Sequence, residues 1–569
     1  MTTISSKWSL LTLVILSLFY FATPEAARAQ TGQKELVLHR LWTHSHGQFD
    51  KAAAEVVVHS PSTKRLYVSN AAESRIDVLD IEKGERIAIL DVSTLGKPTS
   101  VAVTDRFVVT AVAHPQNTMP GSCVFFDLKS GKELWRVPVG AHPDMVAVTP
   151  DGNTVLVANE GEPNEAYSQD PHGSISVIDF TGPQGGPKVR TIGFEQFDPQ
   201  RDELIARGVR ITGPSTKHPD RLATVAEDLE PEYIAISADG RKAWVTLQEN
   251  NAIAVLDIEK GHIENIVSCG LKDHSQDNHG LDVSDRDGSD NKEPAIQIAP
   301  APVWGLYQPD AIVAFEHQGN TFLLTANEGD SRKYDGYRDV KKAGKLKLPD
   351  TLSKNEQKRL SRFEISVASS DQRAHPGRLL CFGGRSFSIR DSNGKLIFDS
   401  GDQIEKAIAA RWPTYFNSCN GHQDEMDQMS CKQGPEPEAV TVGAIDGRTY
   451  AFIALEKASI IVIYDISDPE HPGFSGIHMA CKKSEDCKES GAKQDDHSMG
   501  NHSMGNHSMG NHSMGNHSMD GLCPETMAFI PTKLSPTGKP LLAVAYEVSG
   551  TTALYEIRVE ERSASAQVP

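Results

Sequence analysis

The sequence predicts an all-β fold, a seven-bladed β-propeller with long polar loop insertions. The first observation is an internal repeat along most of the chain, in which an acidic residue is followed by three short apolar strands. The second is its period, since Glu55, Ser100 and Asp144 lie 45 and 44 residues apart, the length of a four-stranded blade. A β-sandwich, the competing architecture, has no such register.

Each unit of the repeat has the same internal order. Asp-Gly pairs at Asp151, Asp239 and Asp446 join the first two strands, as tight hairpins prefer. A fourth strand is predicted in the segments ERIAIL, ELWRVPV, VRTIGF, IENIVS and KLIFD. The seven units begin at Glu55, Ser100, Asp144, Glu232, Asp310, Glu438 and Glu525.

The last unit ends after its third strand, near Val559. Residues 35–42, ELVLHRLW, have strand character but belong to no unit. We therefore expect residues near 35–42 to pair beside residues near 551–559. This pairing would close the ring with an N-terminal strand and remove an exposed sheet edge.

Five insertions interrupt the repeat, at about 181–230, 270–308, 330–378, 403–436 and 478–523. They are polar and rich in Gly, Asp, Ser and Pro, and helical periodicity is clear only in TLSKNEQKRLSRFE. Loops of this kind on a rigid scaffold typically carry binding residues.

The N-terminal segment predicts export. Lys7 precedes an apolar run at 8–22, and Ala27-Arg28-Ala29 offers a small-x-small cleavage site. The run is shorter than the roughly 20 residues that span a bilayer. We expect a signal peptide at 1–29, a single propeller domain at 30–559, a disordered tail at 560–569 and no membrane span in the mature chain. The protein would be secreted, periplasmic or held at the cell surface.

The charge of the chain narrows its partners. The net charge is −19, and removal of the signal peptide leaves −20. Nucleic acid is excluded as a partner because its phosphates need a basic footprint. The expected partners are metal cations and an unknown surface or matrix component.

Eight cysteines permit disulfides outside the cytosol. Cys419 with Cys431, and Cys481 with Cys487, are close enough in sequence to close short loops. Cys123 lies in a strand pattern and is expected to be a buried thiol.

The acidic residues of the repeat form the predicted cation site. Five units enter their first strand through a Pro-acid pair, and five second strands end in Glu. In a propeller both positions emerge on one face, and their oxygens suit hard cations, calcium first. Alternatively, each acid caps its own blade by accepting backbone N–H bonds. The predicted ligands are Glu55, Asp144, Asn159, Glu160, Glu232, Asp310, Asn327, Glu328, Glu438 and Glu525.

A low-complexity tract at 497–519, within the insertion 478–523, repeats His-Ser-Met-Gly-Asn. Imidazole and thioether groups suit copper or another soft metal. We expect the tract to be disordered without metal; the alternative is a flexible repeat-expanded loop with no selected role. The candidate ligands are His497, His502, His507, His512 and His517.

Several longer motifs resemble the choice-of-anchor I family. They include PDMVAVTPDG, LVANEGEP, EDLEPEYIAISADG, TANEGDSR, GPEPEAVTVG and EVSGTTALYEI, and together they extend from about residue 54 to 558. The family is also similar to mesenchyme-specific cell-surface glycoproteins. The resemblance implies an extracellular or surface-held propeller.

Two functions remain open. No GxSxG, HExxH or GxxxxGK[ST] motif occurs, so no catalytic residue is predicted and a non-enzymatic binding or scaffold protein is favoured. Some bacterial relatives carry an alkaline phosphatase label, which implies a metal-dependent phosphomonoesterase as the alternative. In it, Arg332 and Arg385 would bind phosphoryl oxygens. The other interpretation is that both arginines form salt bridges with nearby acids.

Overall fold

The computed structural model describes residues 34–180, 186–480 and 520–561. The predicted signal peptide, the His/Met tract, Cys481 and Cys487 lie outside these ranges.

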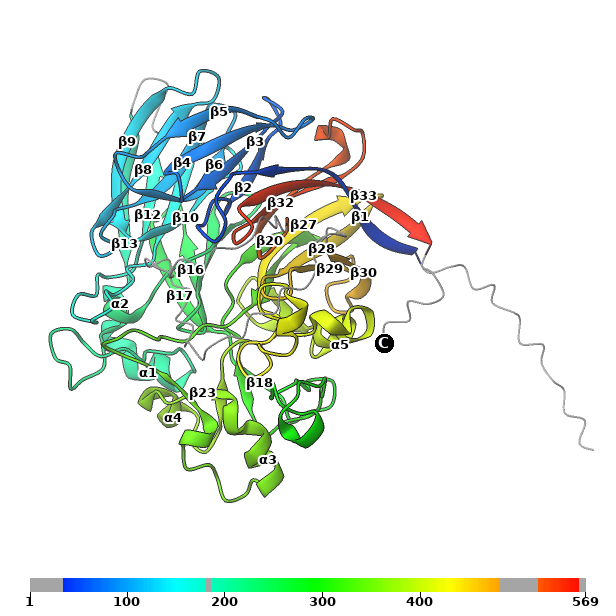
Figure 1. Ribbon diagram of the computed structural model, residues 1–569. Coiled ribbons are helices and arrows are strands. Elements are labelled where there is room, and N and C mark those ends of the chain that lie inside the picture. The colour runs from blue at the N-terminus through cyan, green and yellow to red at the C-terminus, as the bar shows by residue number, and fades with distance from the viewer. Residues whose placement is uncertain (1–33, 181–185, 481–519, 562–569) are drawn as a thin grey trace, which may run out of the picture.

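The described residues form seven four-stranded antiparallel sheets, and six of these sheets hold their strands in chain order (Figure 1). The all-β prediction is confirmed. The first three sheets contain β2 (Val57–Ser60), β3 (Arg65–Asn70), β4 (Arg75–Asp80) and β5 (Arg86–Asp91); β6 (Lys97–Val103), β7 (Phe107–Ala113), β8 (Pro120–Asp127) and β9 (Glu133–Ala141); and β10 (Pro143–Val148), β11 (Thr154–Asn159), β12 (Ser174–Asp179) and β13 (Lys188–Gly193).

The next three sheets include the remaining fourth strands that the sequence predicts, and all five of those strands are present. These sheets contain β14 (Ile234–Ile236), β15 (Lys242–Leu247), β16 (Ala252–Asp257) and β17 (His262–Ser268); β20 (Ile312–His317), β21 (Asn320–Asn327), β25 (Ser386–Asp391) and β26 (Leu396–Asp399); and β27 (Pro437–Ile445), β28 (Arg448–Leu455), β29 (Ile460–Asp465) and β30 (Gly473–Met479).

The seventh sheet joins the two ends of the described chain. It contains β31 (Pro524–Ile530), β32 (Leu541–Tyr546), β33 (Thr551–Glu561) and β1 (Lys34–Ser45). β1 runs antiparallel to β33 from Lys34 opposite Glu561 to Ser45 opposite Thr551, and the two strands lie side by side in Figure 1. The segments predicted to pair therefore do so. β33 also includes Glu560 and Glu561, so the predicted tail at 560–569 starts too early by these two residues.

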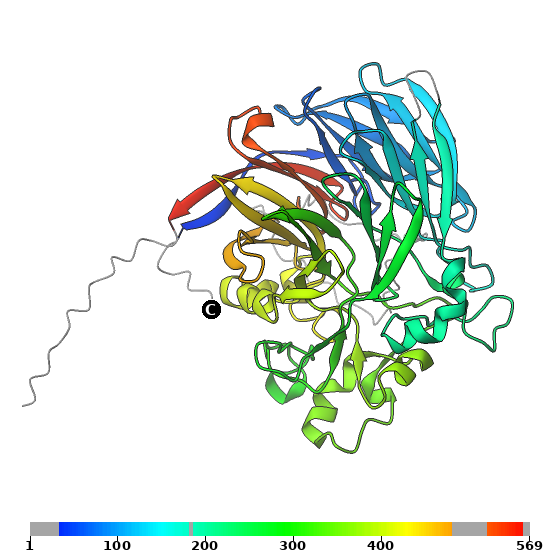
Figure 2. The same ribbon diagram turned by 180° about the vertical axis from the view of Figure 1, so that it is seen from behind.

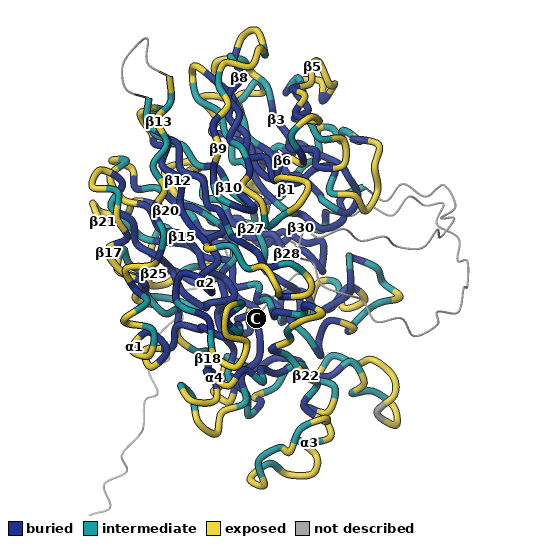
Figure 3. Tube along the Cα trace, turned by 90° about the vertical axis from the view of Figure 1, so that its left-hand side faces the viewer, coloured by how far each residue is buried: buried dark blue, intermediate teal, exposed yellow. Residues whose placement is uncertain are grey.

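Apolar side chains on both faces of the sheets bind each sheet to the next. Val68 and Leu79 of the first sheet, for example, pack in one cluster with Leu541 and Ala543 of the last. The first strand of each repeat unit, called here the inner strand, also contacts the inner strands of the neighbouring sheets. The inner strands are β2, β6, β10, β14, β20, β27 and β31, and β31 contacts β2. Second strands such as β3 and β7 are therefore almost wholly buried, whereas the fourth strand β5 is mostly exposed. Figure 3 shows the buried strands in the interior.

The insertions form a second layer on one side of the sheets, at the bottom of Figure 1 and again in the view from behind in Figure 2. This layer has its own apolar cluster, which includes Leu281, Val303, Leu360 and Phe363. Its helices and small sheets are α1 (Arg201–Ala206), α2 (Val225–Asp228), α3 (Lys354–Arg359), α4 (Ser369–Ala374), α5 (Gln403–Arg411), β18 (Leu271–Asp273) with β19 (Trp304–Leu306) and β24 (Leu380–Cys381), and β22 (Val340–Lys342) with β23 (Glu364–Ser366).

Helices also occur outside TLSKNEQKRLSRFE, because short segments such as α5 bury a few apolar residues, here Ile404 and Ile408, without a long periodic pattern. One expectation about the insertions is wrong. Cys419 and Cys431 are free thiols. The Cys431 thiol donates to the Gln428 carbonyl at 3.6 Å, so this sulfur is directed elsewhere. Cys123 is a buried thiol, as predicted.

Candidate metal centre

The acids that begin the inner strands are held at one end of these strands by a shared backbone contact. The N–H groups of Glu55, Glu232 and Asp310 donate to carbonyls of the second strands of their sheets, at 3.3, 3.1 and 3.1 Å. Asp144, Glu438 and Glu525 occupy the second position of β10, β27 and β31. The six acids that the repeat places at the start of a first strand therefore lie there, whereas the second sheet has Ser100 in its first strand.

A second backbone contact holds the glutamates that follow the second strands. The N–H groups of Glu160, Glu456 and Glu547 donate to the carbonyls of His142, Glu436 and Cys523, at 2.9, 2.8 and 2.9 Å. Each of these acceptors precedes a Pro-acid pair and has a positive φ, of 43°, 50° and 56°, which is uncommon for a residue other than glycine. The left-handed turn thus places the acids that begin the first strands beside the glutamates that follow the second strands. We call these two sets of acids together the acidic layer.

One group of acids consists of Asp310, Glu328 and Glu438. One carboxylate oxygen from each lies within 4.8 Å of the other two. Burial and the Asp144 carboxylate raise the pKa of Asp310 to about 8. Burial followed by Glu328 and Glu525 raises the pKa of Glu438 well above its ordinary value. Three carboxylates this close need either bound protons or a cation.

Glycine backbone positions Glu328 in this group. Gly329 has a φ of +91°, and a side-chain carbon there would lie 2.0 Å from the backbone nitrogen of Gly383. The close approach requires glycine. The Gln248 amide then donates to Glu328 Oε2 at 2.6 Å, which orients the carboxylate.

A neighbouring group consists of Glu328, Glu436 and Glu456, whose ligand atoms also lie within 4.8 Å of one another. Lys457 supplies a positive charge here, with Nζ 2.6 Å from Glu456 Oε1 and 3.4 Å from Glu436 Oε2. Burial raises the pKa of Glu436 to about 7 although Lys457 opposes the shift. The lysine already balances part of this charge, so the group around Asp310 has the greater need for a cation.

Several buried carboxylate oxygens in this layer lack a hydrogen-bond partner. They are Oε2 of Glu55, Glu232, Glu249 and Glu438. Glu55, Glu232 and Glu249 are 3%, 7% and 8% exposed, so bulk water does not solvate these groups freely. A buried, unpartnered carboxylate oxygen is costly, and a cation would satisfy several at once.

Two of the predicted ligands use their side-chain amides for hydrogen bonds to nearby strands. The Asn159 amide donates to Ser176 Oγ at 3.0 Å and accepts from the Gly140 N–H at 2.9 Å. The Asn327 amide donates to Ser388 Oγ at 2.8 Å. Their side chains tie adjacent strands together, and we leave both out of the proposed site.

Arg332 and Arg385 are both buried in ion pairs. The Arg332 guanidinium lies 2.8 Å from Asp228 Oδ1 and 2.7 Å from Glu230 Oε2. Arg385 Nη1 lies 2.7 Å from Glu405 Oε1, and its Nη2 donates to two backbone carbonyls. The structure therefore shows the salt bridges that the sequence left open as the alternative to phosphate binding.

The sequence did not single out His142 or Glu162, which lie beside Glu160. His142 Nδ1 is 2.9 Å from Glu160 Oε2 and 3.1 Å from Glu162 Oε2. Burial alone would lower the pKa of His142, but the carboxylates of Glu160 and Glu162 raise it well above its ordinary value. The sequence feature that could have identified His142 was the repeated X-Pro-acid pattern, in which His142 occupies the X position.

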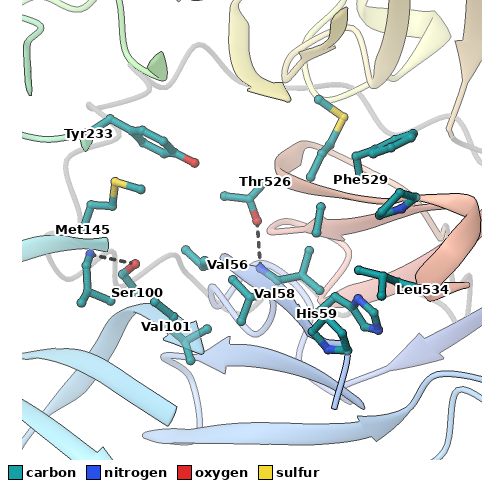
Figure 4. A pocket seen from close by; sticks show the side chains of 17 residues that line it. Val56, Val58, His59, Ser100, Val101, Met145, Tyr233, Thr526, Phe529 and Leu534 are labelled. Carbon is teal, nitrogen blue, oxygen red and sulfur yellow. Dashed lines mark hydrogen bonds between the residues drawn. The ribbon is translucent and has the colours of Figure 1, made fainter. Parts of the chain in front are cut away.

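An apolar cavity of about 330 Å³ lies along the inner strands next to the acids. Figure 4 shows Met145 and Tyr233 facing it from one side and Phe529 and Leu534 from the other. Met145 and Tyr233 directly follow Asp144 and Glu232 in the sequence. Residues that line this mainly apolar cavity therefore directly follow acids in the sequence.

The fold and the acidic layer define the class of the protein: an all-β chain of four-stranded sheets whose inner strands present carboxylates at one end. The model of the choice-of-anchor I domain matches residues 55–469. The chain therefore belongs to the choice-of-anchor I family, which confirms the resemblance seen in the sequence. None of the helices in the described part of the chain has the length and hydropathy needed to cross a bilayer.

Individual relatives are more distant. Gigasin-3a of Magallana gigas is 27% identical over 208 residues, which cover 34% of this chain and 64% of that protein. The mesenchyme-specific cell surface glycoprotein of Strongylocentrotus purpuratus is 26% identical over 321 residues, covering 49% of this chain and 40% of that protein. The chain thus spans less than two thirds of either relative's length. The β-propeller domain of Cps50 (Swd1) from Myceliophteria thermophila matches with 10% identity and a TM-score of 0.41, covering 92% of this chain and 100% of that chain.

Proposed function

We propose that this chain is an exported, non-enzymatic surface protein, a closed seven-bladed β-propeller whose acidic layer binds calcium. The family and the relative described as a cell surface glycoprotein support the location. Contacts between consecutive inner strands, together with the β1–β33 pairing, support the closed ring. The ligand or matrix component that the propeller recognises is not specified by this proposal.

The observation that carries calcium binding is the group of Asp310, Glu328 and Glu438. Their oxygens are close enough to share one ion, and one oxygen of Glu438 has no other partner. Calcium accepts six to eight oxygen ligands at about 2.3–2.6 Å and tolerates irregular geometry. Carboxylates from different sheets would then be joined by the ion, so calcium binding would stabilise the assembly of the sheets.

Thermal denaturation of the metal-free protein tests calcium binding. Because calcium would bind only the folded state, a concentration one hundred times the Kd should stabilise the protein by about 2.7 kcal/mol. EDTA should reverse the rise in Tm. The double variant Asp310→Asn with Glu438→Gln should lose the response. It should melt above the metal-free wild type because the amides avoid the cost of burying two carboxyl groups whose pKa values are raised on folding.

The matched control is the pair Glu82→Gln and Asp105→Asn, which removes two exposed acids of the same types. This variant should keep the full calcium response. A wild-type Tm indifferent to calcium, in protein shown by metal analysis to be free of ions, would contradict calcium binding and leave the acids as caps of their own sheets.

The alternative function is a metal-dependent phosphomonoesterase, and the described residues offer no observation that favours it. The guanidinium groups of Arg332 and Arg385 are bound to buried acids and carbonyls. We expect no hydrolysis of a generic phosphomonoester above background at alkaline pH, with or without calcium. Calcium-dependent turnover abolished by Asp310→Asn would establish the enzyme instead.

A further inference from the structure

A separate group of ligands lies at the loops that flank β10 and follow β11. It contains His142, Glu160 and Glu162, whose ligand atoms all lie within 4.8 Å of one another. Of the three such groups among the described residues, it is the one that includes an imidazole. It shares no residue with the group around Asp310 or with the group around Lys457.

Its geometry differs from that of a simple ion pair. Nδ1 of His142 is near both carboxylates, at 2.9 and 3.1 Å, yet it makes no well-directed hydrogen bond to either. The ring is 2% exposed, so water does not supply the missing partner freely. A buried nitrogen placed between two carboxylate oxygens, without a directed bond to either, is positioned as a ligand to a shared ion.

The charge of the group also calls for a cation. Even a protonated His142 balances only one of the two carboxylates. A divalent ion bound to a neutral imidazole would balance both carboxylates and satisfy Nδ1 at the same time. The Glu160 side chain is 14% exposed, which leaves one side of the group open to an incoming ion.

Surrounding contacts hold the ligands in place. Tyr334 donates to Glu162 Oε1 at 3.2 Å, and the Asn117 amide lies 3.4 Å from Glu162 Oε2. The backbone bond from Glu160 N–H to His142 O joins the two loops that carry the ligands. Hydrogen bonds to ligating carboxylates are the usual outer layer of a metal site.

We propose that His142, Glu160 and Glu162 bind one divalent first-row transition-metal ion, for which zinc is the probe. The imidazole favours such ions over calcium, which prefers oxygen ligands alone. Three protein ligands leave at least one coordination position for water or a further ligand.

The test compares zinc binding by the full mature chain and by two variants, His142→Gln and Glu162→Gln. After equilibration with zinc and dialysis, metal analysis should find one more zinc per wild-type chain than per variant chain. Zinc bound elsewhere, including at the His/Met repeats, is common to all three proteins and cancels in the difference. Zinc affinity at this site should fall at least about 100-fold in each variant.

The second readout is the zinc-dependent rise in Tm, which wild type should show and both variants should lack. His172→Gln is the matched control, because His172 pairs with Glu195 at 3.3 Å on the exposed surface and should leave both readouts unchanged. The variant Asp310→Asn with Glu438→Gln should keep the zinc response, which separates this site from the calcium site.

Two outcomes would overturn the proposal. One is a wild-type Tm that zinc does not raise. This measurement uses the wild-type protein alone, so it does not depend on whether a variant folds. The other is equal zinc content and an equal Tm shift in wild type and in whichever of the two variants circular dichroism shows to be folded. A loss of zinc in His172→Gln as large as in His142→Gln would equally contradict a site built from the buried residues.

Discussion

The sheets and the layer of insertions are stabilised by different interactions. Each sheet packs on the next through apolar side chains, such as Val68 and Leu79 against Leu541. The insertions have a smaller apolar cluster but join one another through buried arginines. Arg210, for example, lies 2.7 Å from Asp339 and 3.0 Å from Asp371, which connects the insertion at 181–230 to that at 330–378.

The difference shows that polar composition does not imply a solvated loop. The guanidinium of Arg332 is buried with two carboxylates, and Lys272 lies buried 3.0 Å from Asp399. Such pairs add little net stability, since desolvation offsets the attraction, but loss of one partner leaves a buried charge unpaired. The insertions should therefore be more sensitive to single charge removals than the sheets are.

The largest expected effect is that of Arg332→Ala. It leaves Asp228 and Glu230 buried without their cation, and the free energy of unfolding should fall by about 3–5 kcal/mol. Denaturant unfolding followed by circular dichroism measures it. Arg286→Ala is the control, because Arg286 is exposed and its ion pair with Asp285 is long, at 4.0 Å. Its effect on the free energy of unfolding should stay within about 0.5 kcal/mol. Equal effects would remove the contrast between the two regions.

The second prediction concerns the apolar side of the comparison, at the strand pairing that joins the chain ends. Leu38 of β1 is 4% exposed and lies opposite Ile557, whereas Leu41 of the same strand is 40% exposed. Leu38→Ala should lower the free energy of unfolding by about 2–5 kcal/mol, and Leu41→Ala should change it by less than about 0.5 kcal/mol. A Leu38→Ala protein as stable as wild type would show that β1 is dispensable, and the closed ring would then lose its support.

The repeat made the sheets predictable, and the insertions lacked any comparable signal. Strand order, the fourth strands and the partner of residues 35–42 follow from counting units, because each repeat unit has the same apolar pattern. The nine residues of α5 are too few to reveal a helical period. Cys419 and Cys431 are close in sequence, but both are free thiols. The Cys431 thiol donates to the Gln428 carbonyl, which no spacing rule indicates.

The candidate site was predictable to the same extent as the repeat. The acids at the starts of the inner strands recur at fixed positions, and two of them, Asp310 and Glu438, lie in one group with Glu328. Asn159 and Asn327 recur in the same way, yet their amides bond serines of the next strand. His142 was missed because one histidine before a proline has no counterpart in the other units. Its role depends on a positive φ, and the sequence does not display φ.

The smallest expected effect comes from a polar contact beside the β1–β33 pairing, and it tests whether the sheets also depend on a buried charge. His46, which follows β1, lies 2.7 Å from Asp77 Oδ2 and 2.9 Å from Thr552 Oγ1. Burial alone would raise the pKa of Asp77, but hydrogen bonds from His46 and Asn70 hold it well below its ordinary value.

A carboxyl with a lowered folded-state pKa stabilises the protein above the unfolded-state pKa, and this contribution is lost as the pH falls. Asp77→Asn should therefore lower the free energy of unfolding by about 1–3 kcal/mol at pH 7. The difference from wild type should shrink as the pH falls below about 3.9, the ordinary pKa of aspartate. Urea unfolding of both proteins between pH 3 and 7 measures this, with Asp105→Asn as the exposed control. A difference that stays constant over this range would mean that the Asp77 carboxylate contributes through its shape and not through its charge, and the contrast between apolar sheets and charge-linked insertions would become sharper.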